Sequence, residues 1–142
     1  MQEIEQNVVF SDKVVNITTA KLPQKIKKPK VYESSVVDAC IKWLCAQGLF
    51  CWRNNSGAYK PEGGNSYVRY GYPGSSDILA INKQGTLVCI ECKSDTGKLT
   101  DKQIAFGQKI TASNGVYVMA RGIDDLERNR AAILGQNFLP SA

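Results

Sequence analysis

Asp77, Glu91 and Lys93 are the residues of this chain whose types and spacing most clearly suggest chemistry. Glu91 follows Asp77 by fourteen positions, and Lys93 follows Glu91 by two. The segment between the acids is apolar except at residues 82–86, which predicts a β-hairpin with a three-residue loop and Gly85 in the left-handed conformation. In that register Asp77 lies opposite Glu91. Lys93 shares the face of Glu91 because alternate residues of a strand point the same way.

Two carboxylates and one ammonium therefore converge at the open end of this hairpin. Both faces of the hairpin read as buried, so solvated surface charges are not expected there. Two neighbouring carboxylates raise each other's pKa unless a cation lies between them, and oxygen ligands favour a hard ion such as Mg²⁺ or Mn²⁺. The alternative is that Glu91 and Lys93 form a solvated pair on an edge strand and Asp77 only ends a loop.

The element after Lys93 supports the first interpretation. Residues 100–103 have the pattern of a capping box that opens a helix. Gln103 then begins the apolar stripe of that helix, so we expect its amide near Lys93. The alternative role of Gln103 is to complete the cap, and the two roles are compatible.

A helix is also predicted over residues 33–47, ended by Gly48. Its apolar face begins with Glu33, which we expect at the rim of the same site as a further ligand, direct or through water. The alternative is that Glu33 is a favourable first-turn acid at the positive end of the helix dipole.

The segment from Phe50 to Tyr72 contains the candidates for nucleic-acid contact. Residues 50–53 read as the first core strand, and the Asn- and Gly-rich turn after it would lie near the metal site. Tyrosines between residues 67 and 72 either stack on unpaired bases or cover a core. The residues that we expect to contact phosphate are Arg53, Asn55, Ser56, Arg69 and, in the polar loop before the 100–103 helix start, Lys98.

The order of these features resembles that of the VRR-NUC family, a branch of the PD-(D/E)XK nuclease superfamily. The resemblance covers residues 32–121 and is to the small stand-alone members encoded by bacteriophages. The residues that carry it are Glu33, the segment 71–77 that ends in Asp77, Glu91-Cys92-Lys93, Gly97-Lys98-Leu99 and Gln103. One departure is Ser76 before Asp77, where the superfamily has proline.

The resemblance implies an α/β fold whose core follows the order αβββαβ, a mixed sheet flanked by helices. It implies that Asp77 and Glu91 bind the metal by their carboxylates and Cys92 by its backbone carbonyl. Lys93 would be the catalytic lysine, Gln103 the motif glutamine and Glu33 the first-helix acid. The implied reaction is Mg²⁺- or Mn²⁺-dependent cleavage of a phosphodiester bond that leaves a 5′-phosphate and a 3′-hydroxyl.

The resemblance also implies a substrate and an assembly. The partner would be branched DNA, notably a four-way (Holliday) junction that a homodimer resolves. A dimer suits symmetric incision, which needs two active sites related by a twofold axis. Two alternatives remain open: a nuclease of the same superfamily that cuts duplex or nicked DNA without regard to branching, and a non-catalytic nucleic-acid-binding module.

The composition of the chain favours some kinds of partner and excludes some kinds of catalysis. The chain has 142 residues, 18 Lys and Arg against 13 Asp and Glu, and a formal charge of +5, which suits a polyanionic partner. It has no histidine, which excludes Ser-His-Asp catalysis, Cys-His catalysis and His-ligated zinc. Its five cysteines include Cys89 and Cys92, which would face opposite sides of a strand and so neither chelate zinc nor pair. The other three read as small core residues.

Two parts of the chain are predicted. Residues 1–30 would be an N-terminal arm with a Lys-rich linker, and residues 31–142 the nuclease domain. The arm contains two short apolar segments, at residues 7–10 and 14–17, that read as strands able to pair with a second subunit. The odd cysteine count, the lack of a signal peptide and the lack of a membrane-length apolar run predict a reducing cytoplasm and no membrane partner. For a phage-encoded protein this would be the cytoplasm of the bacterial host.

Overall fold

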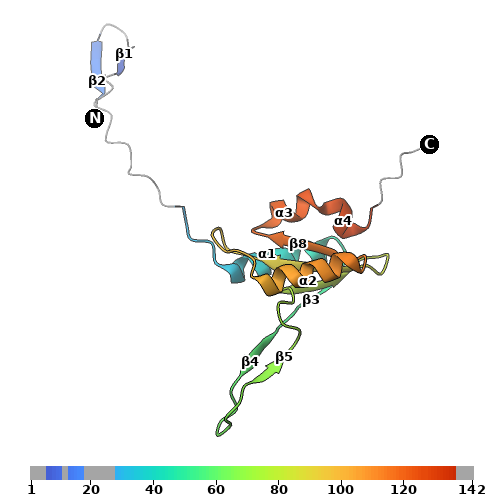
Figure 1. Ribbon diagram of the computed structural model, residues 1–142. Coiled ribbons are helices and arrows are strands. Elements are labelled where there is room, and N and C mark those ends of the chain that lie inside the picture. The colour runs from blue at the N-terminus through green and yellow to red at the C-terminus, as the bar shows by residue number, and fades with distance from the viewer. Residues whose placement is uncertain (1–5, 11–12, 18–27, 137–142) are drawn as a thin grey trace, which may run out of the picture. The chain divides into compact units, whose positions relative to one another are not determined.

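The structure is a computed structural model that describes the backbone of residues 6–10 and 13–17 and all of residues 28–136. The chain forms two compact units, Met1–Lys30 and Val31–Ala142, which are coloured in sequence order in Figure 1. In the first unit, strands β1 (Gln6–Phe10) and β2 (Lys13–Ile17) pair antiparallel with each other. Most of the Lys-rich linker lies outside the described residues.

The second unit is a mixed α/β structure built on a four-stranded sheet in the order β3-β6-β7-β8. Strands β3, β6 and β7 pair antiparallel, and β8 pairs parallel with β7. Helix α1 precedes the sheet and helix α2 connects β7 to β8. The bounds are α1 (Glu33–Ala46), β3 (Phe50–Arg53), β6 (Ile78–Ile81), β7 (Leu87–Cys92), α2 (Asp101–Ala112) and β8 (Val116–Ala120).

The hairpin between β6 and β7 has the predicted register. Asn82 and Thr86 pair, with a backbone hydrogen bond of 3.1 Å, and Gly85 has φ of +79°. The Asn82 side chain strengthens this turn, because its Oδ1 accepts from the backbone N–H groups of Gln84 and Thr86 at 3.0 Å each. Continued by one residue, the pairing of Ile78 with Ile90 places Asp77 opposite Glu91.

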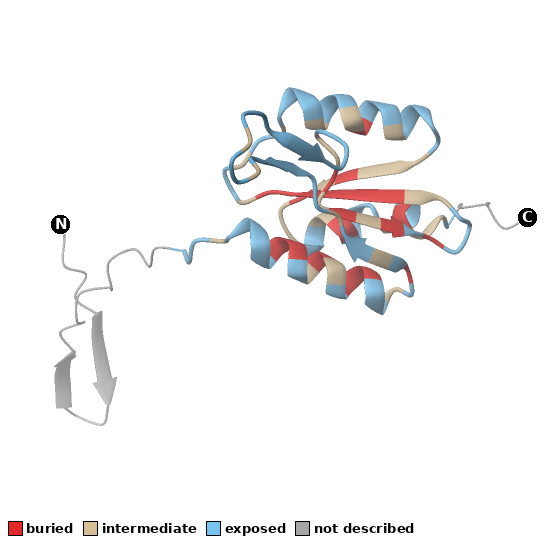
Figure 2. Ribbon diagram, turned by 90° about the horizontal axis from the view of Figure 1, so that it is seen from below, coloured by how far each residue is buried: buried red, intermediate tan, exposed pale blue. Residues whose placement is uncertain are grey.

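Helices cover the two faces of the sheet, as Figure 2 shows. Helix α1 packs on one face together with the short helix α3 (Ile123–Arg128), and α2 packs on the other face against β8. The sequence pattern predicts one helix over residues 124–134, with Asp124 and Asp125 at its start. The structure instead has α3 and α4 (Arg130–Leu134), because Asn129 leaves the helical conformation and its side chain donates to the Asp125 carbonyl at 2.8 Å.

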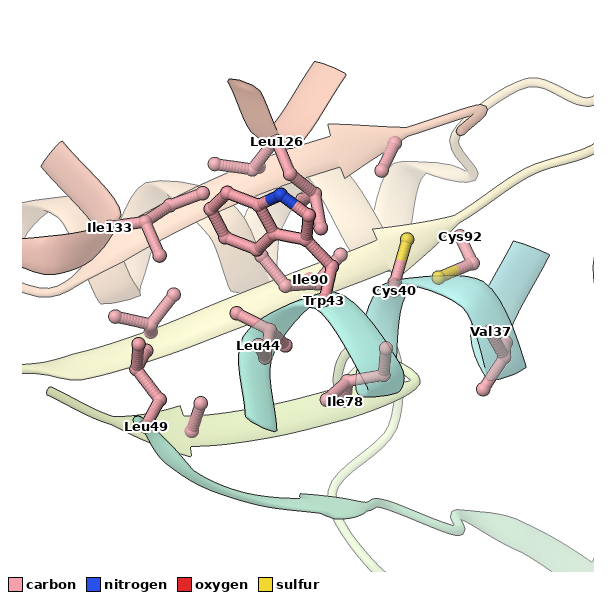
Figure 3. Close-up of a cluster of buried hydrophobic side chains, with 14 of the residues drawn as sticks. Val37, Cys40, Trp43, Leu44, Leu49, Ile78, Ile90, Cys92, Leu126 and Ile133 are labelled. Atoms are coloured by element: carbon pink, nitrogen blue, oxygen red, sulfur yellow. The ribbon is translucent and has the colours of Figure 1, made fainter. Parts of the chain in front are cut away.

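The hydrophobic core lies between α1, the sheet and helices α3 and α4 (Figure 3). Cys92 faces this core beside Cys40, on the opposite side of the strand from Glu91. Cys45 is exposed, so the prediction that it is a core residue is wrong. The fully buried large aliphatic side chains of the core are Leu44, Ile78, Ile90, Leu126 and Ile133.

The α2 side of the sheet is only partly covered, which corrects the prediction that both hairpin faces are buried. Phe50 and Trp52 of β3 and Ile81 of β6 are exposed on this face. The register places Phe50 opposite Ile81 and Trp52 opposite Leu79, so these side chains form one surface. Helix α2 packs on the β8 side of the sheet and leaves this surface open to solvent.

A separate two-stranded ribbon stands between β3 and β6 in the sequence. It consists of β4 (Gly57–Tyr59) and β5 (Val68–Tyr70), which pair antiparallel with each other and with no strand of the main sheet. All six of these residues are exposed, and Figure 1 shows the ribbon extending away from the sheet. Tyr70 is therefore exposed and covers no part of the core.

Candidate metal centre

Glu91 and Lys93, both buried, form one polar cluster with the half-buried Gln103 on the α2 side of the sheet. Lys93 Nζ lies 2.9 Å from Glu91 Oε1, and the side-chain amide of Gln103 donates to the same oxygen. The Gln103 oxygen accepts from the Thr100 N–H at 2.8 Å and so completes the capping box of α2. Gln103 therefore caps the helix and also contacts Glu91, the ion-pair partner of Lys93.

The second carboxylate oxygen of Glu91 is buried and unpaired. Glu91 is 1% exposed, and its Oε2 has no hydrogen-bond partner among the residues that the structure describes. Burial raises the pKa of Glu91 to about 7; Asp77 and Glu33 act in the same direction, and Lys93 opposes them. A buried carboxylate oxygen without a donor is costly, so it marks a position where a cation would be stabilising.

The environment of Lys93 favours its ammonium form. Burial alone would lower its pKa, but the hydrogen bond to Glu91 and the negative charges of Glu91, Glu33 and Asp77 raise it above its ordinary value. Gly97 lies against the Lys93 side chain, and a Cβ at residue 97 would be 3.2 Å from Lys93 Cδ. A side chain at residue 97 would therefore press on Lys93, which would have to shift by a few tenths of an ångström.

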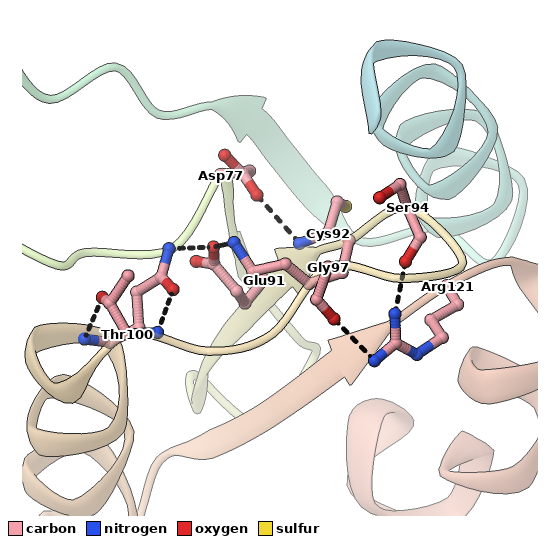
Figure 4. Close-up of polar contacts among 9 residues, drawn as sticks. Asp77, Glu91, Cys92, Ser94, Gly97, Thr100 and Arg121 are labelled. Carbon is pink, nitrogen blue, oxygen red and sulfur yellow. Dashed lines mark hydrogen bonds and ion pairs between the residues drawn. The ribbon is translucent and has the colours of Figure 1, made fainter. Parts of the chain in front are cut away.

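Asp77 is fixed at the end of the same hairpin (Figure 4). Its Oδ2 accepts a hydrogen bond of 2.8 Å from the Cys92 backbone N–H. The N–H and C=O of one strand residue point to the same side, so the Cys92 carbonyl faces the edge where Asp77 lies. The side chain of Cys92 is in the core, so only its backbone is available to the site, as the resemblance implies.

Glu33 is the first residue of α1 and is exposed. It raises the pKa of both Glu91 and Lys93 by its charge. Within the described part of the chain, no hydrogen bond or ion pair joins it to either residue. Glu33 therefore contributes to the field of the site from its rim, which fits a ligand through water better than a direct one.

Arg121 is a site residue that the sequence interpretation missed. Its guanidinium donates to the backbone carbonyls of Ser94 and Gly97, the latter at 2.7 Å, and so holds the loop that follows Lys93 (Figure 4). The backbone N–H of Arg121 donates to the Asp125 carboxylate at 2.8 Å. The parallel pairing of Cys92 with Ala120 places Arg121 beside Lys93, but this neighbourhood is visible only once the strand order is known.

Four of the five predicted phosphate-contact residues lie on the segment from the end of β3 to β5, and the fifth, Lys98, lies in the loop before α2. Arg53 ends β3, and Asn55 and Ser56 lie between it and β4; all three are exposed. Arg69 is exposed on β5, and Lys98 is exposed in the loop before α2. Asn54 joins the segment after β3 to the site, because its backbone N–H donates to the Asp77 carbonyl at 2.7 Å.

The cluster fits a hard divalent ion with a small protein ligand set. Among the described residues, no three Asp, Glu or Cys side chains gather closely enough to hold a metal by themselves. Asp77 and Glu91 would supply two carboxylates, the Cys92 carbonyl a third oxygen, and water the rest. Mg²⁺ is commonly held in this way, by one or two carboxylates and several waters.

Comparisons of the chain with protein-family models, with curated proteins and with solved structures found no match. None of the helices in the described part of the chain is long and apolar enough to cross a membrane. The functional assignment therefore rests on the residues of the site.

Proposed function

We propose that this chain is a metal-dependent endonuclease of the VRR-NUC type that hydrolyses phosphodiester bonds in DNA. The observation that carries the proposal is the unpaired, buried Oε2 of Glu91, held beside Lys93 and on the strand next to Asp77. The order α1-β3-β6-β7-α2-β8 supports it, since it follows the αβββαβ order of the PD-(D/E)XK core.

Each residue then has a defined role. Asp77, Glu91 and the Cys92 carbonyl would hold Mg²⁺ or Mn²⁺. When bound, the ion would polarise a phosphate oxygen and lower the pKa of a coordinated water. Gln103 and Lys93 hold one oxygen of Glu91 and leave the other free for a ligand. Lys93, whose ammonium lies 2.9 Å from Glu91 Oε1, would orient the attacking water or stabilise negative charge on the phosphate.

For the substrate we propose branched DNA, cut by a homodimer. The test uses labelled linear duplex, flap and four-way junction DNA with Mg²⁺, Mn²⁺ or EDTA. The expected result is paired symmetric nicks in the junction that require a divalent ion and are lost in Asp77→Asn. Asp95→Asn is the matched control, because Asp95 is exposed in the neighbouring loop.

Each other outcome has a defined meaning. Equal cutting of linear and branched DNA would replace the junction specificity with general duplex cleavage. Binding without metal-dependent cutting would reject the nuclease in favour of a non-catalytic module. Light scattering of the same preparation measures whether the chain is a dimer.

A further inference from the structure

The β4–β5 ribbon has one aromatic face. Paired residues of a ribbon share a face, so the register places Gly57, Tyr59, Val68 and Tyr70 together and Ala58 and Arg69 on the other side. Tyr59 is 55% exposed and Tyr70 is 49% exposed. Their ring centroids are 6.5 Å apart, and Val68 lies beside them. These rings bury nothing of the core, so packing does not account for them.

Gly57 shapes this face. A Cβ at residue 57 would lie 2.7 Å from the Tyr70 hydroxyl and 3.0 Å from the ring carbon that bears it. The glycine therefore lets the Tyr70 ring lie across the opposite strand instead of being pushed away from it. The result is an open platform of two neighbouring rings.

The base of the ribbon is hydrogen-bonded to Asp77, through the backbone N–H of Asn54. The Asn54 side chain donates to Ser75 Oγ and to the Ser76 carbonyl at 2.9 Å each, so the strand entering the ribbon is tied to the strand leaving it. Gly71, with φ of +70°, allows the two strands to approach, because a Cβ there would be 2.8 Å from Ser56 Cβ. These contacts attach the base of the ribbon to the segment that ends in Asp77.

A second attachment joins the ribbon to α2. A Cβ at Gly74 would lie 2.5 Å from the carbonyl of Lys102, which shows how closely this turn approaches the helix. The Tyr72 ring packs on Phe106 with centroids 5.7 Å apart, and Lys109 donates to the Tyr72 hydroxyl at 2.7 Å. Tyr72 thus has a structural role, unlike Tyr59 and Tyr70.

Charge and size indicate the kind of partner. Residues 53–72 contain Arg53, Lys60 and Arg69 against one acid, Glu62, so the ribbon suits a polyanion. Three half-exposed side chains fall far short of the roughly 800 Å² per partner of a stable protein interface. Aromatic rings beside basic residues are the usual means of holding unpaired nucleotides.

We propose that the Tyr59–Tyr70 face stacks on unpaired DNA bases next to the phosphate presented to Asp77 and Glu91. The inference rests on the proposed nuclease function and adds that nucleotides next to the cut are unpaired in the complex, whether in the free DNA or on binding. Stacking is sequence-tolerant because every base has a π-face, so no sequence preference follows from this contact.

The test measures binding by fluorescence anisotropy in EDTA, where no cutting occurs. The probes are a labelled 20-nucleotide oligothymidine, an abasic strand of the same length, and a blunt 20-base-pair duplex. The wild type should bind oligothymidine at least about tenfold more tightly than the abasic strand. The Tyr59→Ala/Tyr70→Ala double variant should lose this preference, and Tyr59→Phe/Tyr70→Phe should keep it. Thermal melting of each variant verifies the fold.

Two results would overturn the inference: a preference for bases that survives in the alanine variant, or equal losses on single-stranded and duplex DNA. These outcomes are separable from failure of the nuclease proposal. Normal base-dependent binding with no metal-dependent cutting would reject the proposed nuclease function but support base stacking on the Tyr59–Tyr70 face. Cutting that Asp77→Asn abolishes, together with unchanged binding by the alanine variant, would reject the platform alone.

Discussion

Asp77 Oδ2 accepts a hydrogen bond of 2.8 Å from the backbone N–H of Cys92, across the open end of the β6–β7 hairpin. The bond fixes one carboxylate against the strand that carries the other, Glu91. It uses one oxygen of Asp77, just as Lys93 and Gln103 use one oxygen of Glu91. Each acid is therefore oriented through one of its oxygens. We expect that an amide at either position removes the negative charge while the protein still folds.

The first prediction concerns Glu91 and pH. Its pKa is raised by burial to about 7, so the folded protein binds this proton more tightly than the unfolded chain. The stabilisation is complete below about pH 4.5 and is lost as the pH rises through 7. In EDTA, the wild type should lose about 2–3 kcal/mol of unfolding free energy between pH 5 and 8 relative to Glu91→Gln. Denaturant titrations at several pH values measure this difference.

The control for this effect is Mg²⁺. At pH 8, Mg²⁺ should raise the unfolding free energy of the wild type. It should leave that of Glu91→Gln nearly unchanged, because the substitution removes one charged ligand of the ion. Parallel pH profiles of the two proteins in EDTA would contradict the environment described for Glu91.

The second prediction concerns the buried ion pair. Lys93→Met leaves the Glu91 charge without its cation, which should destabilise the fold by about 3–5 kcal/mol above pH 7. The double variant Lys93→Met/Glu91→Gln should recover much of this loss, since no unpaired charge remains. Urea unfolding of the wild type, both single variants and the double variant gives the coupling energy. Additive losses would mean that the two side chains do not interact.

The third prediction concerns Arg121. Arg121→Lys keeps the charge but cannot bind the Ser94 and Gly97 carbonyls with one planar fork. Amide hydrogen exchange over residues 94–99 should accelerate by about tenfold or more, while exchange in β7 stays slow. Arg130→Lys is the matched control, because Arg130 pairs with Glu127 and does not contact the Asp125 carboxylate. Unchanged exchange in the loop would show that Arg121 does not hold it.

The fourth prediction compares two glycines with similar backbone angles. Gly74 (φ +81°) is crowded by Lys102, whereas Gly63 (φ +74°), near the ribbon tip, has no neighbour within 4 Å. Gly63→Ala should lower the unfolding free energy by only about 1 kcal/mol, which is the cost of holding alanine in the left-handed conformation. Gly74→Ala should cost clearly more, because the turn must move away from α2. Thermal unfolding ranks the two variants, and equal losses would contradict the close approach at Gly74.

Much of the site could be predicted because its signals are local. The spacing of Asp77, Glu91 and Lys93 with Gly85 between them determines a hairpin register, and the Thr100–Gln103 box determines a helix start. The roles of Asn54 and Arg121 could not be found in this way. Each acts through backbone groups that become neighbours only after distant strands pair, and neither lies in a distinctive local pattern.

The larger corrections have the same physical origin. The exposed surface formed by Phe50, Trp52 and Ile81 depends on which strands α2 covers, and the sequence periodicity of β6 does not specify that. The ribbon between β3 and β6 was expected only as a turn and possible strand residues, because strands of three residues carry little alternation. The break between α3 and α4 depends on a single residue, Asn129, whose side chain satisfies a backbone carbonyl.

The central claim is that Asp77 and Glu91 share a divalent cation, and crystals grown with Mn²⁺ test it most directly. We predict an anomalous peak within about 2.0–2.5 Å of an oxygen of each carboxylate, with the Cys92 carbonyl in the same shell. The peak should be absent from Asp77→Asn crystals grown in the same way. A wild-type structure in which Mn²⁺ lies elsewhere, or in which Glu91 Oε2 is bound by a protein donor instead, would contradict the account.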